Sequence, residues 1–290
     1  MTADVPASRE LAAIAERAAR ATGDRLRAAF RSRPPIDLKA DHHDPVTEHD
    51  RAAEETIREV LAEHTPGSVV VGEEGGVREA GAARGTGGDV RWYVDPIDGT
   101  ANFAVGLPFF CTSIAAVADG ELVAGVVYDP VRDDMFTASL DGAACNGEPI
   151  RSTGASRDRN AVIATSFPSA RDLAGGDRAE TLRQYGRLVD AFATVRRPGS
   201  AALTLAHVAA GWTDVAYDSS INAYDIAAGL LLVRRAGGTY VPLGGAPGGD
   251  DWDAPGYLAC VAGFDLAGSV VAEVAGLTAQ ECPGDFPPVR

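Results

Sequence analysis

Helix-like and strand-like apolar patterns follow one another in a fixed order along the chain, and this order limits the folds available to it. Strand-like runs in the first half lie at residues 68–72, 91–94, 112–118, 122–128 and 136–138, after helical patterns at 8–31 and 47–64. The second half alternates, with strands expected at 161–165 and 213–217 and helices at 177–192, 201–210 and 226–235. Neighbouring strands in one half and alternation in the other predict a layered α+β fold of mixed sheets and helices.

Turn-forming residues mark the connections between these segments. Asp119-Gly120 predicts a hairpin, and the turn at Asn146-Gly147 extends the same meander. Residues 75–89 are Gly-rich and are expected to have little regular structure, while Gly23 weakens the centre of the first helix. The Ser-, Gly- and Arg-containing stretch at 152–160 is the best candidate for a boundary between two subregions.

The charge of the chain excludes some classes of partner. Its 290 residues contain 26 Lys+Arg and 41 Asp+Glu, so the formal net charge at pH 7 is −15. Non-specific binding to nucleic acid or to an anionic membrane needs an excess of Lys and Arg, so neither partner is expected. An anionic substrate would also be repelled, unless a local positive centre such as a metal ion reverses the field.

The N-terminal sequence and the apolar runs predict a soluble cytoplasmic protein. Asp4, Arg9 and Glu10 leave no room for the apolar core of a signal peptide, and no uncharged apolar run approaches the ~20 residues of a membrane span. The four cysteines lie too far apart for the usual zinc frameworks, so buried or inert thiols in a reducing compartment are expected. They are Cys111, Cys145, Cys260 and Cys282.

Acidic residues gather at the ends of predicted strands and at the start of a predicted helix. The acids concerned are Glu73 and Glu74, Asp95 and Asp98, and Asp225. Side chains at such positions project into a shared cleft and suit Mg²⁺, which takes a few carboxylates, several waters and a substrate phosphate. Since one carboxylate can bridge two ions, Asp95 and Asp98 could build a two-metal site.

The residues that follow Asp98 are suited to phosphate. Gly99 lets the backbone approach an anion closely. Thr100 stands where a helix could begin, and a helix start offers free amide groups and the positive end of the dipole. Together with divalent ions, these groups would reverse the local effect of the net charge of −15.

Each acidic position also has a purely structural interpretation. Glu73-Glu74 alone is typical of a solvated strand end, and Asp95-Pro96 and Asp98-Gly99 are typical of turns. Asp50 completes a match to a capping box that begins at Thr47. Asp225, before an apolar run, is most simply a helix N-cap. Taken singly, these residues therefore leave the metal site as one of two interpretations.

The order and the residues of these motifs resemble those of the inositol monophosphatase family, the lithium-sensitive, Mg²⁺-dependent sugar-phosphate phosphatases. The string Asp95-Pro96-Ile97-Asp98-Gly99-Thr100-Ala101-Asn102-Phe103 resembles the first signature of the family. A second signature of the family is resembled by Tyr224-Asp225-Ile226-Ala227-Ala228-Gly229 together with Ala236-Gly237-Gly238. Two upstream elements match in the right order, Asp44-Pro45-Val46-Thr47-Glu48-His49-Asp50 and Gly72-Glu73-Glu74. The resemblance runs from about residue 11 to residue 264.

The resemblance implies the fold and the assembly. The expected fold is a layered α-β-α-β-α sandwich of the sugar-phosphatase type, formed by one domain over residues 1–290. Residues 1–154 would then contain most metal ligands, and 155–290 would contain Asp225 and the substrate side. Family members also lead us to expect a homodimer and inhibition by Li⁺.

The resemblance further implies a site for two or three Mg²⁺ ions. Glu73, Asp95 and the carbonyl of Ile97 would hold one ion. Asp95, Asp98 and Asp225 would hold a second, and Glu73 would help to place a weaker third.

Catalytic and phosphate-binding roles follow from the same match. Catalytic roles are implied for Asp50, Thr100 and Glu73, with the Thr100 hydroxyl, paired with Asp50, orienting or deprotonating the attacking water. The backbone amides of Gly99 and Thr100 would bind the phosphate. Lys39 matches a family lysine in a mobile loop near the metals.

The substrate side departs from the family pattern. The residues implied there are Asp98, Gly199, Ser200, Ala201 and Asp218. In inositol-specific members a glutamate stands seven residues before the second-signature aspartate and bonds substrate hydroxyls, and here Asp218, one methylene shorter, occupies that position. Ser200 stands where the family often has Thr, and Tyr224 where it usually has Trp. Either neutral drift or a substrate other than myo-inositol phosphate explains these differences.

The sequence thus predicts Mg²⁺-dependent hydrolysis of a small polyol or sugar phosphate monoester, with inositol monophosphate as the first choice. Histidinol-phosphate phosphatase, fructose-1,6-bisphosphatase and 3′-phosphonucleotide phosphatase activities are the alternatives within the same chemistry. An alternative of a different class is a phosphate-binding regulator that has lost catalysis. The complete set of carboxylates, together with Thr100 and Asp50, favours an enzyme.

Overall fold

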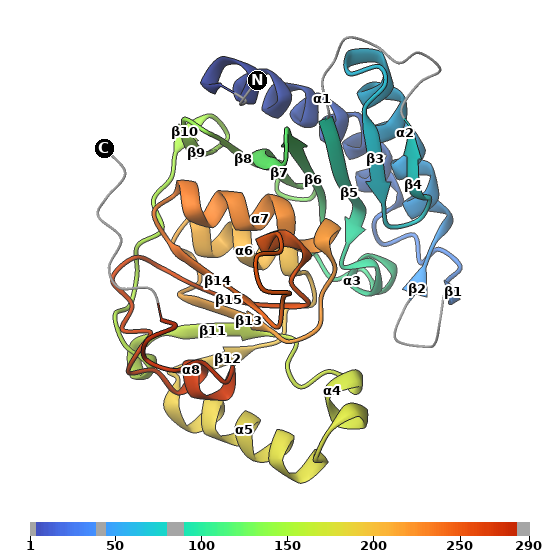
Figure 1. The fold of residues 1–290 in the computed structure, drawn as a ribbon. Coiled ribbons are helices and arrows are strands. Elements are labelled where there is room, and N and C mark those ends of the chain that lie inside the picture. Colours follow the sequence, from blue (N-terminus) through green and yellow to red (C-terminus); the bar gives the residue numbers. More distant parts are fainter. Residues whose placement is uncertain (1–3, 39–44, 80–89, 283–290) are drawn as a thin grey trace.

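Two large β-sheets alternate with three layers of helices in the computed structural model, which describes residues 4–38, 45–79 and 90–282 (Figure 1). Within these residues the larger sheet has eight strands in the order β10-β9-β8-β7-β6-β5-β3-β4. The smaller sheet has five, in the order β12-β11-β13-β15-β14. The α+β class and the α-β-α-β-α layering predicted from the sequence are confirmed.

The larger sheet contains a meander of hairpins. Its strands are β3 (Val69–Gly72), β4 (Gly76–Glu79), β5 (Val90–Asp98), β6 (Cys111–Ala118), β7 (Glu121–Asp129), β8 (Asp134–Ser139), β9 (Gly142–Cys145) and β10 (Glu148–Pro149). Neighbouring strands are antiparallel except β3 and β5, which run parallel. Asp119 and Gly120 have φ angles of 51° and 81°, as the tight turn between β6 and β7 requires, so the predicted hairpin is confirmed.

The smaller sheet is mixed. Its strands are β11 (Val162–Thr165), β12 (Thr194–Arg196), β13 (Val215–Asp218), β14 (Thr239–Leu243) and β15 (Gly256–Cys260). β11 runs parallel to β12 and β13, whereas β15 pairs antiparallel with β13 and β14. The chain passes from the larger sheet to the smaller after Pro149, through residues 152–160. The division into subregions at this point stays a prediction.

The helices form the remaining layers. They are α1 (Val5–Ala29), α2 (Glu48–His64), α3 (Thr100–Val105), α4 (Ala170–Gly175), α5 (Arg178–Ala191), α6 (Ala201–Ala209), α7 (Ala223–Arg235) and α8 (Val270–Val274). α1 and α2 cover the outer face of the larger sheet, α6 and α7 lie between the sheets, and α5 and α8 lie beyond the smaller sheet (Figure 1). Short pieces complete the chain: β1 (Asp37–Leu38), β2 (Pro45–Val46) and the 3₁₀ turns Asp158–Asn160 and Asp251–Asp253.

The position of α7 explains its sequence. Residues 225–233 are all buried, because both sheets and α6 pack around this helix. A helix enclosed on all sides has no need of a polar face, which accounts for the apolar run that follows Asp225. None of the described helices is both long enough and apolar enough to cross a membrane.

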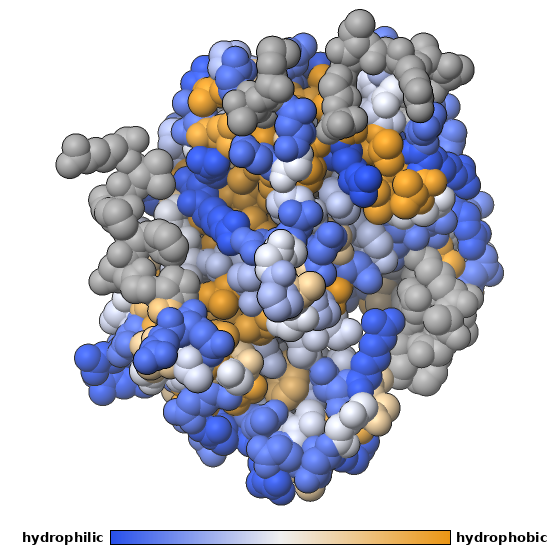
Figure 2. Space-filling model, viewed as in Figure 1, coloured by the Kyte–Doolittle hydropathy of each residue, from blue (hydrophilic) through white to orange (hydrophobic). Residues whose placement is uncertain are grey.

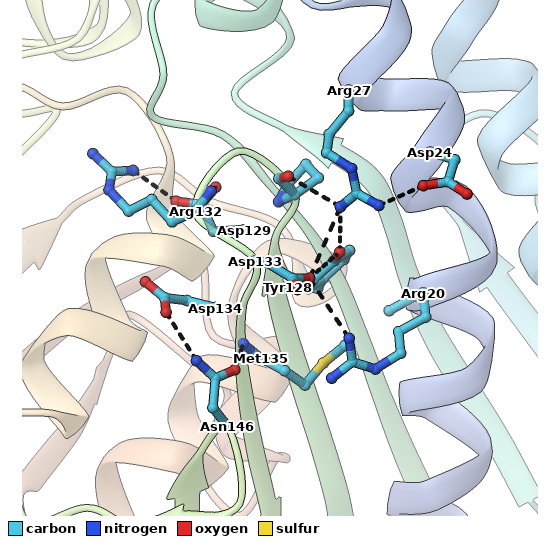
Figure 3. Close-up of polar contacts among 12 residues, drawn as sticks. Arg20, Asp24, Arg27, Tyr128, Asp129, Arg132, Asp133, Asp134, Met135 and Asn146 are labelled. Carbon is cyan, nitrogen blue, oxygen red and sulfur yellow. Dashed lines mark hydrogen bonds and ion pairs between the residues drawn. The ribbon is translucent and has the colours of Figure 1, made fainter.

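Gly23 lies where α1 meets the end of β7. A Cβ atom at Gly23 would lie 2.9 Å from Cε1 of Tyr128, closer than side chains pack. The Tyr128 hydroxyl accepts a hydrogen bond from Arg27 at 2.7 Å and donates one to Asp133 at 2.6 Å (Figure 3). Arg27 also pairs with Asp24 at 2.6 Å. The glycine that weakens α1 as an isolated helix therefore makes room for the ring that fastens α1 to the sheet.

The low-order segment predicted at residues 75–89 is partly wrong. Residues 76–79, expected to lie in a low-order segment, form β4, which pairs antiparallel with β3 at the edge of the sheet. All residues of β4 are exposed, so the strand has no apolar alternation that could reveal it. Figure 2 shows an apolar patch over β3 and β4, and Val77 of β4 is 69% exposed. Residues 80–89 lie outside the described part of the chain.

The four cysteines are free thiols. Cys111, Cys260 and Cys282 are buried, and Cys145 is half-buried. Burial raises the pKa of the Cys111 thiol well above its usual value, so this group stays protonated and unreactive at neutral pH. Burial is thus confirmed for three of the four positions.

Candidate metal and phosphate site

Parallel pairing of β3 and β5 brings Glu73 next to Asp95. Gly72, the last residue of β3, lies opposite Val94. The amide of Glu73 donates a hydrogen bond to the carbonyl of Val94 at 3.1 Å. Because the carboxyl ends of parallel strands meet at one edge of a sheet, the acids that follow Gly72 and Val94 lie side by side.

A bulge in β5 turns Asp95 and Asp98 toward one site. The sequence predicts a strand over residues 91–94, whereas β5 continues to Asp98. Asp95 lies opposite Ser113 and Asp98 opposite Cys111, so β5 contains one residue more than β6 over this span. Side chains three apart in a regular strand point to opposite faces, and the extra residue returns both to the same side. Pro96, which has no N–H for the ladder, suits such a bulge.

Asp225 is held at the start of α7. The predicted N-cap role is wrong: Asn222 is the N-cap, and Asp225 is the third residue of the helix. Asp225 Oδ2 accepts a hydrogen bond from the Asn222 amide at 2.9 Å, which completes a capping box. The same carboxylate also lies beside the other acids of the site.

Asp95, Asp98 and Asp225 form a buried cluster in which one carboxylate oxygen of each lies within 4.8 Å of the others. Burial raises the pKa of Asp98 to about 6 and that of Asp225 to about 8. Burial also raises the pKa of Asp95 well above its usual value, and the charge of Glu73 adds to all three shifts. A cation bound among these groups would relieve both the desolvation and the repulsion.

Thr100 and Asp50 are hydrogen-bonded. The Thr100 hydroxyl donates to Asp50 Oδ1 at 2.8 Å and lies 3.0 Å from the carbonyl oxygen of Ile97. Asp50 Oδ2 accepts from the amide and the hydroxyl of Thr47, at 2.8 and 2.6 Å, so the predicted capping box of α2 is present. One carboxylate oxygen of Asp50 therefore belongs to the capping box and the other accepts the Thr100 hydroxyl, so the capping role leaves the catalytic role open as a prediction.

Gly99 stands directly before α3. Its φ of 98° lies in the left-handed region, and a Cβ atom there would approach the carbonyl oxygens of Gly199 and Phe109 to 3.1 Å. Both the backbone conformation and the space thus require glycine. Thr100 is the first residue of the helix, so the amide end of α3 adjoins the acid cluster.

The segment at Gly199, Ser200 and Ala201 is tied to Asp98. Asp98 Oδ2 accepts hydrogen bonds from the Ser200 hydroxyl at 2.6 Å and from the Ala202 amide at 2.7 Å. Ser200 is the N-cap of α6 and is buried. Its hydroxyl thus binds a site carboxylate and the start of a helix, in the segment that the sequence assigns to the substrate.

Asp218, at the end of β13, has both carboxylate oxygens occupied by the protein. The amide of Ser166 donates to Oδ1, and the Tyr257 hydroxyl donates to Oδ2 at 3.0 Å. Burial raises the pKa of Asp218 to about 6, against the opposing effect of these two hydrogen bonds. The Asp218 side chain, one methylene shorter than the glutamate that the resemblance implies, is therefore held by hydrogen bonds within the smaller sheet.

Two residues near the site were given no role from the sequence. The side-chain amide of Asn102 donates to the carbonyls of Phe109 and Pro198, both at 2.7 Å, and so holds α3 against the segment before Gly199. Glu54 of α2 accepts from the amides of Glu74 and Gly75. A signal existed only for Glu54, which lies one helical turn after Asp50 on the same face. Lys39 lies outside the described residues.

Comparison with known proteins assigns the chain to a family. The model of the inositol monophosphatase family matches residues 7–276. The chain belongs to the inositol monophosphatase family. It is 43% identical over 230 residues to the Nus factor SuhB of Pseudomonas aeruginosa, covering 78% of this chain and 82% of the relative. It is 41% identical over 207 residues to the inositol-1-monophosphatase of Rhizobium meliloti, covering 70% and 75%.

Solved structures of this family have the same fold. The extragenic suppressor protein suhB of Bartonella henselae superposes with a TM-score of 0.78 at 31% identity, over 92% of this chain and 97% of that one. The inositol monophosphatase of Anabaena superposes with a TM-score of 0.72 at 28% identity, over 96% and 98%.

The donor set of the site fits a hard divalent cation. Asp95, Asp98 and Asp225 offer carboxylate oxygens, and Glu73 lies close enough to raise the pKa of each. Mg²⁺ prefers such oxygens, whereas zinc and copper sites use the nitrogen and sulfur ligands that this cluster lacks among the described residues. The acidic cluster is thus compatible with the Mg²⁺ dependence that is general in the family.

Proposed function

We propose that this chain is a Mg²⁺-dependent phosphomonoesterase that hydrolyses a small polyol or sugar phosphate, with inositol monophosphate as the first candidate. One observation carries the proposal: a buried carboxylate cluster lies beside a threonine whose hydroxyl is bonded to a further carboxylate, Asp50. Family membership supports the phosphatase class, and relatives named inositol-1-monophosphatase support the substrate.

Glu73, Asp95, Asp98, Asp225 and the carbonyl of Ile97 would hold two or three Mg²⁺ ions. When bound, the ions would lower the pKa of water, neutralise phosphate oxygens and stabilise the leaving alkoxide. The protein contributes carboxylates that are already gathered and largely removed from solvent.

The pair of Thr100 and Asp50 would orient the attacking water. Since the Thr100 hydroxyl donates its proton to Asp50, its oxygen can accept a hydrogen bond from water. As the water attacks phosphorus, its proton can pass to Thr100 while the hydroxyl proton of Thr100 passes to Asp50. Asp50 then holds that proton, the bond between phosphorus and the esterified oxygen breaks as the bond to the water oxygen forms, and the leaving alkoxide takes a proton from a second water, without a covalent phosphoenzyme.

Phosphate would bind at the amide end of α3. The backbone of Gly99 and Thr100 supplies N–H donors there, and Gly99 has no side chain to block the approach. Ser200 and Ala201 begin α6 beside Asp98, so a second helix start faces the same site. The polyol would then lie toward Gly199 and Asp218.

A panel of phosphate esters tests the proposal. We expect Mg²⁺-dependent phosphate release from inositol monophosphate, with histidinol phosphate, fructose-1,6-bisphosphate and 3′-phosphoadenosine 5′-phosphate as the competing substrates. The Asp95→Asn variant should lose turnover at least about 100-fold, while Asp190→Asn, at an exposed position in α5, should not. Full turnover by Asp95→Asn, or activity after thorough chelation, would contradict the metal assignment. No release from any ester, with Mg²⁺ still bound, would favour a phosphate-binding regulator.

Inhibition by Li⁺, a homodimer and a cytoplasmic location belong to the same proposal. Li⁺ inhibition can be measured in the phosphate-release assay, and the mass of the particle by light scattering. Location can be followed with a fluorescent fusion in cells.

The name of several relatives suggests a second candidate. Relatives that are 37–43% identical are called Nus factor SuhB, and this chain could have that role in addition to hydrolysis. The net charge of −15 opposes direct contact with a nucleic-acid backbone, so we predict that the purified chain does not retain RNA in 150 mM salt. Retention that weakens as salt is raised would overturn this prediction.

A further inference from the structure

The turn that contains Glu73 is fastened to α2 by one buried carboxylate. Glu54, 3% exposed, accepts hydrogen bonds from the amide of Glu74 at 2.7 Å and from that of Gly75 at 2.9 Å. The amide of Glu73 itself is held by β5, through the carbonyl of Val94 at 3.1 Å. Consecutive amides of the turn thus have fixed partners on two different elements, and the backbone that directs the Glu73 side chain has little freedom.

Gly72 and Gly75, which flank Glu73 and Glu74, leave room for the Glu54 carboxyl group. A Cβ atom at Gly72 would lie 2.5 Å from the Glu54 carboxyl group, and one at Gly75 would lie 2.6 Å from Oε1. Neither glycine has a positive φ, so the reason for their small size is this close approach and not the backbone conformation.

Arg58 completes the contact. Its Nε donates to Glu54 Oε1 at 3.0 Å, and its terminal nitrogen donates to the carbonyl of Gly76 at 3.0 Å. Glu54 and Arg58 are both buried, at adjacent turns of α2. The pair therefore binds both amide and carbonyl groups of the turn, and the charge of Glu54 is compensated within the protein.

Helix α2 carries a second group of the same site. Asp50, one turn before Glu54 and also buried, accepts the hydrogen bond of Thr100. One face of α2 thus contacts the segment that begins α3 and the turn that follows β3, which are far apart in the sequence. A shift of this helix would move both.

We propose that Glu54 is a positioning residue that sets the direction of Glu73 toward the metal, through the turn of Glu74 and Gly75. This inference rests on the proposed function and assigns to it a residue that does not itself touch metal or substrate. Glu54 acts by fixing the backbone, so its loss should weaken the affinity for Mg²⁺ more than it reduces the rate at saturating Mg²⁺.

The test compares Glu54→Gln with Glu55→Gln, a control at the next, exposed position of α2. The glutamine keeps one acceptor but places an amide nitrogen opposite a backbone N–H. Isothermal titration with MgCl₂ should give a dissociation constant about 10- to 100-fold higher for Glu54→Gln. In the phosphate-release assay, kcat at saturating Mg²⁺ should recover to within a few-fold of the parent. Glu55→Gln should match the parent in both measurements.

A second variant covers the case in which Glu54→Gln does not fold. Gly75→Ala keeps every charge and displaces the Glu54 carboxylate by its new methyl group, so it should weaken Mg²⁺ binding in the same direction. A lower melting temperature with unchanged Mg²⁺ affinity, in either variant, would reduce Glu54 to a structural role and overturn the inference. If the parent binds no Mg²⁺, the proposed function itself fails, which is a different result from equal binding by parent and variant.

Discussion

Asp98 and Ala202 are joined by a hydrogen bond of 2.7 Å between the aspartate Oδ2 and the alanine amide. Asp98 ends β5 of the larger sheet, and Ala202 lies in the first turn of α6, between the sheets. The same carboxylate belongs to the cluster with Asp95 and Asp225. The geometry of the acid cluster therefore depends on a helix that begins more than 100 residues later in the chain.

The Thr100 hydroxyl can be tested without disturbing α2. Thr100→Ala should lower kcat by about 10²- to 10⁴-fold, because the hydroxyl that bridges Asp50 and the attacking water is lost. Thr100→Ser keeps the hydroxyl and should keep most of the activity. The hydrogen bonds from Thr47 to Asp50 are unchanged in both variants, so their melting temperatures should be close. Equal rates for the alanine and serine variants would exclude a role for this hydroxyl.

The metal-free protein should lose stability as the pH rises. Asp98 has a pKa of about 6, Asp225 one of about 8, and that of Asp95 is raised well above its usual value, in each case first by burial. The folded state therefore binds more protons than the unfolded chain above about pH 4. Stability from these groups is complete below their unfolded pKa and is lost as the pH rises through about 6 to about 8.

Thermal denaturation in EDTA measures this dependence. The melting temperature at pH 5.5 should exceed that at pH 8.5, and Mg²⁺ should remove most of the difference because the cation replaces the protons. Titration with Mg²⁺ near pH 7 should also release protons into a weak buffer. A metal-free protein that is more stable at pH 8.5 would show that the carboxylates are not held together as described.

Lengthening Asp218 should change substrate preference. In Asp218→Glu the carboxylate gains the one methylene by which Asp218 departs from the family resemblance, and we expect it to extend past its present partners, Ser166 and Tyr257, toward the proposed polyol position. We expect the ratio of kcat/KM for inositol monophosphate over fructose-1,6-bisphosphate to rise about tenfold or more. An unchanged ratio in a folded variant would place hydroxyl recognition elsewhere.

Two helical glycines should respond to alanine in opposite directions. Gly23→Ala should destabilise by about 1–3 kcal/mol despite the better helix propensity, because the methyl group meets the Tyr128 ring. Gly186→Ala in α5, where no atom lies within 4 Å of a new Cβ, should stabilise by about 0.5–1 kcal/mol. Denaturant unfolding of both variants gives the comparison. Stabilisation by Gly23→Ala would mean that Tyr128 can move away from α1 at little cost.

Local patterns in the sequence were sufficient for most of the fold. The hairpin at Asp119-Gly120, the capping box at Asp50 and the apolar run after Asp225 depend on residues close in sequence, and such signals predict structure well. The edge strand at 76–79 was not predictable, because a fully exposed strand has no apolar period. The bulge between Asp95 and Asp98 was missed because proline and glycine beside the two acids equally suit a turn.

The site required more than local signals. The acids were found from their positions after strands and at a helix start, but the Ala202 amide that holds Asp98 lies more than 100 residues later in the chain. Glu54 was missed for the same reason, because its partners at Glu74 and Gly75 come from another element. The closed hydrogen bonding of Asp218 could not be inferred either, since Ser166 and Tyr257 reach it only through strand pairing.

Three of the acids also hold the starts of helices: Asp50 for α2, Asp98 for α6 and Asp225 for α7. Loss of such a cap costs about 1 kcal/mol or more, whatever the protein does. Selection for folding alone would therefore retain these residues in a descendant that no longer catalysed any reaction. In a lineage of such proteins, the persistence of Asp50, Asp98 and Asp225 would not distinguish an active enzyme from a silent one, whereas changes at Glu73, Asp95 and Thr100 would.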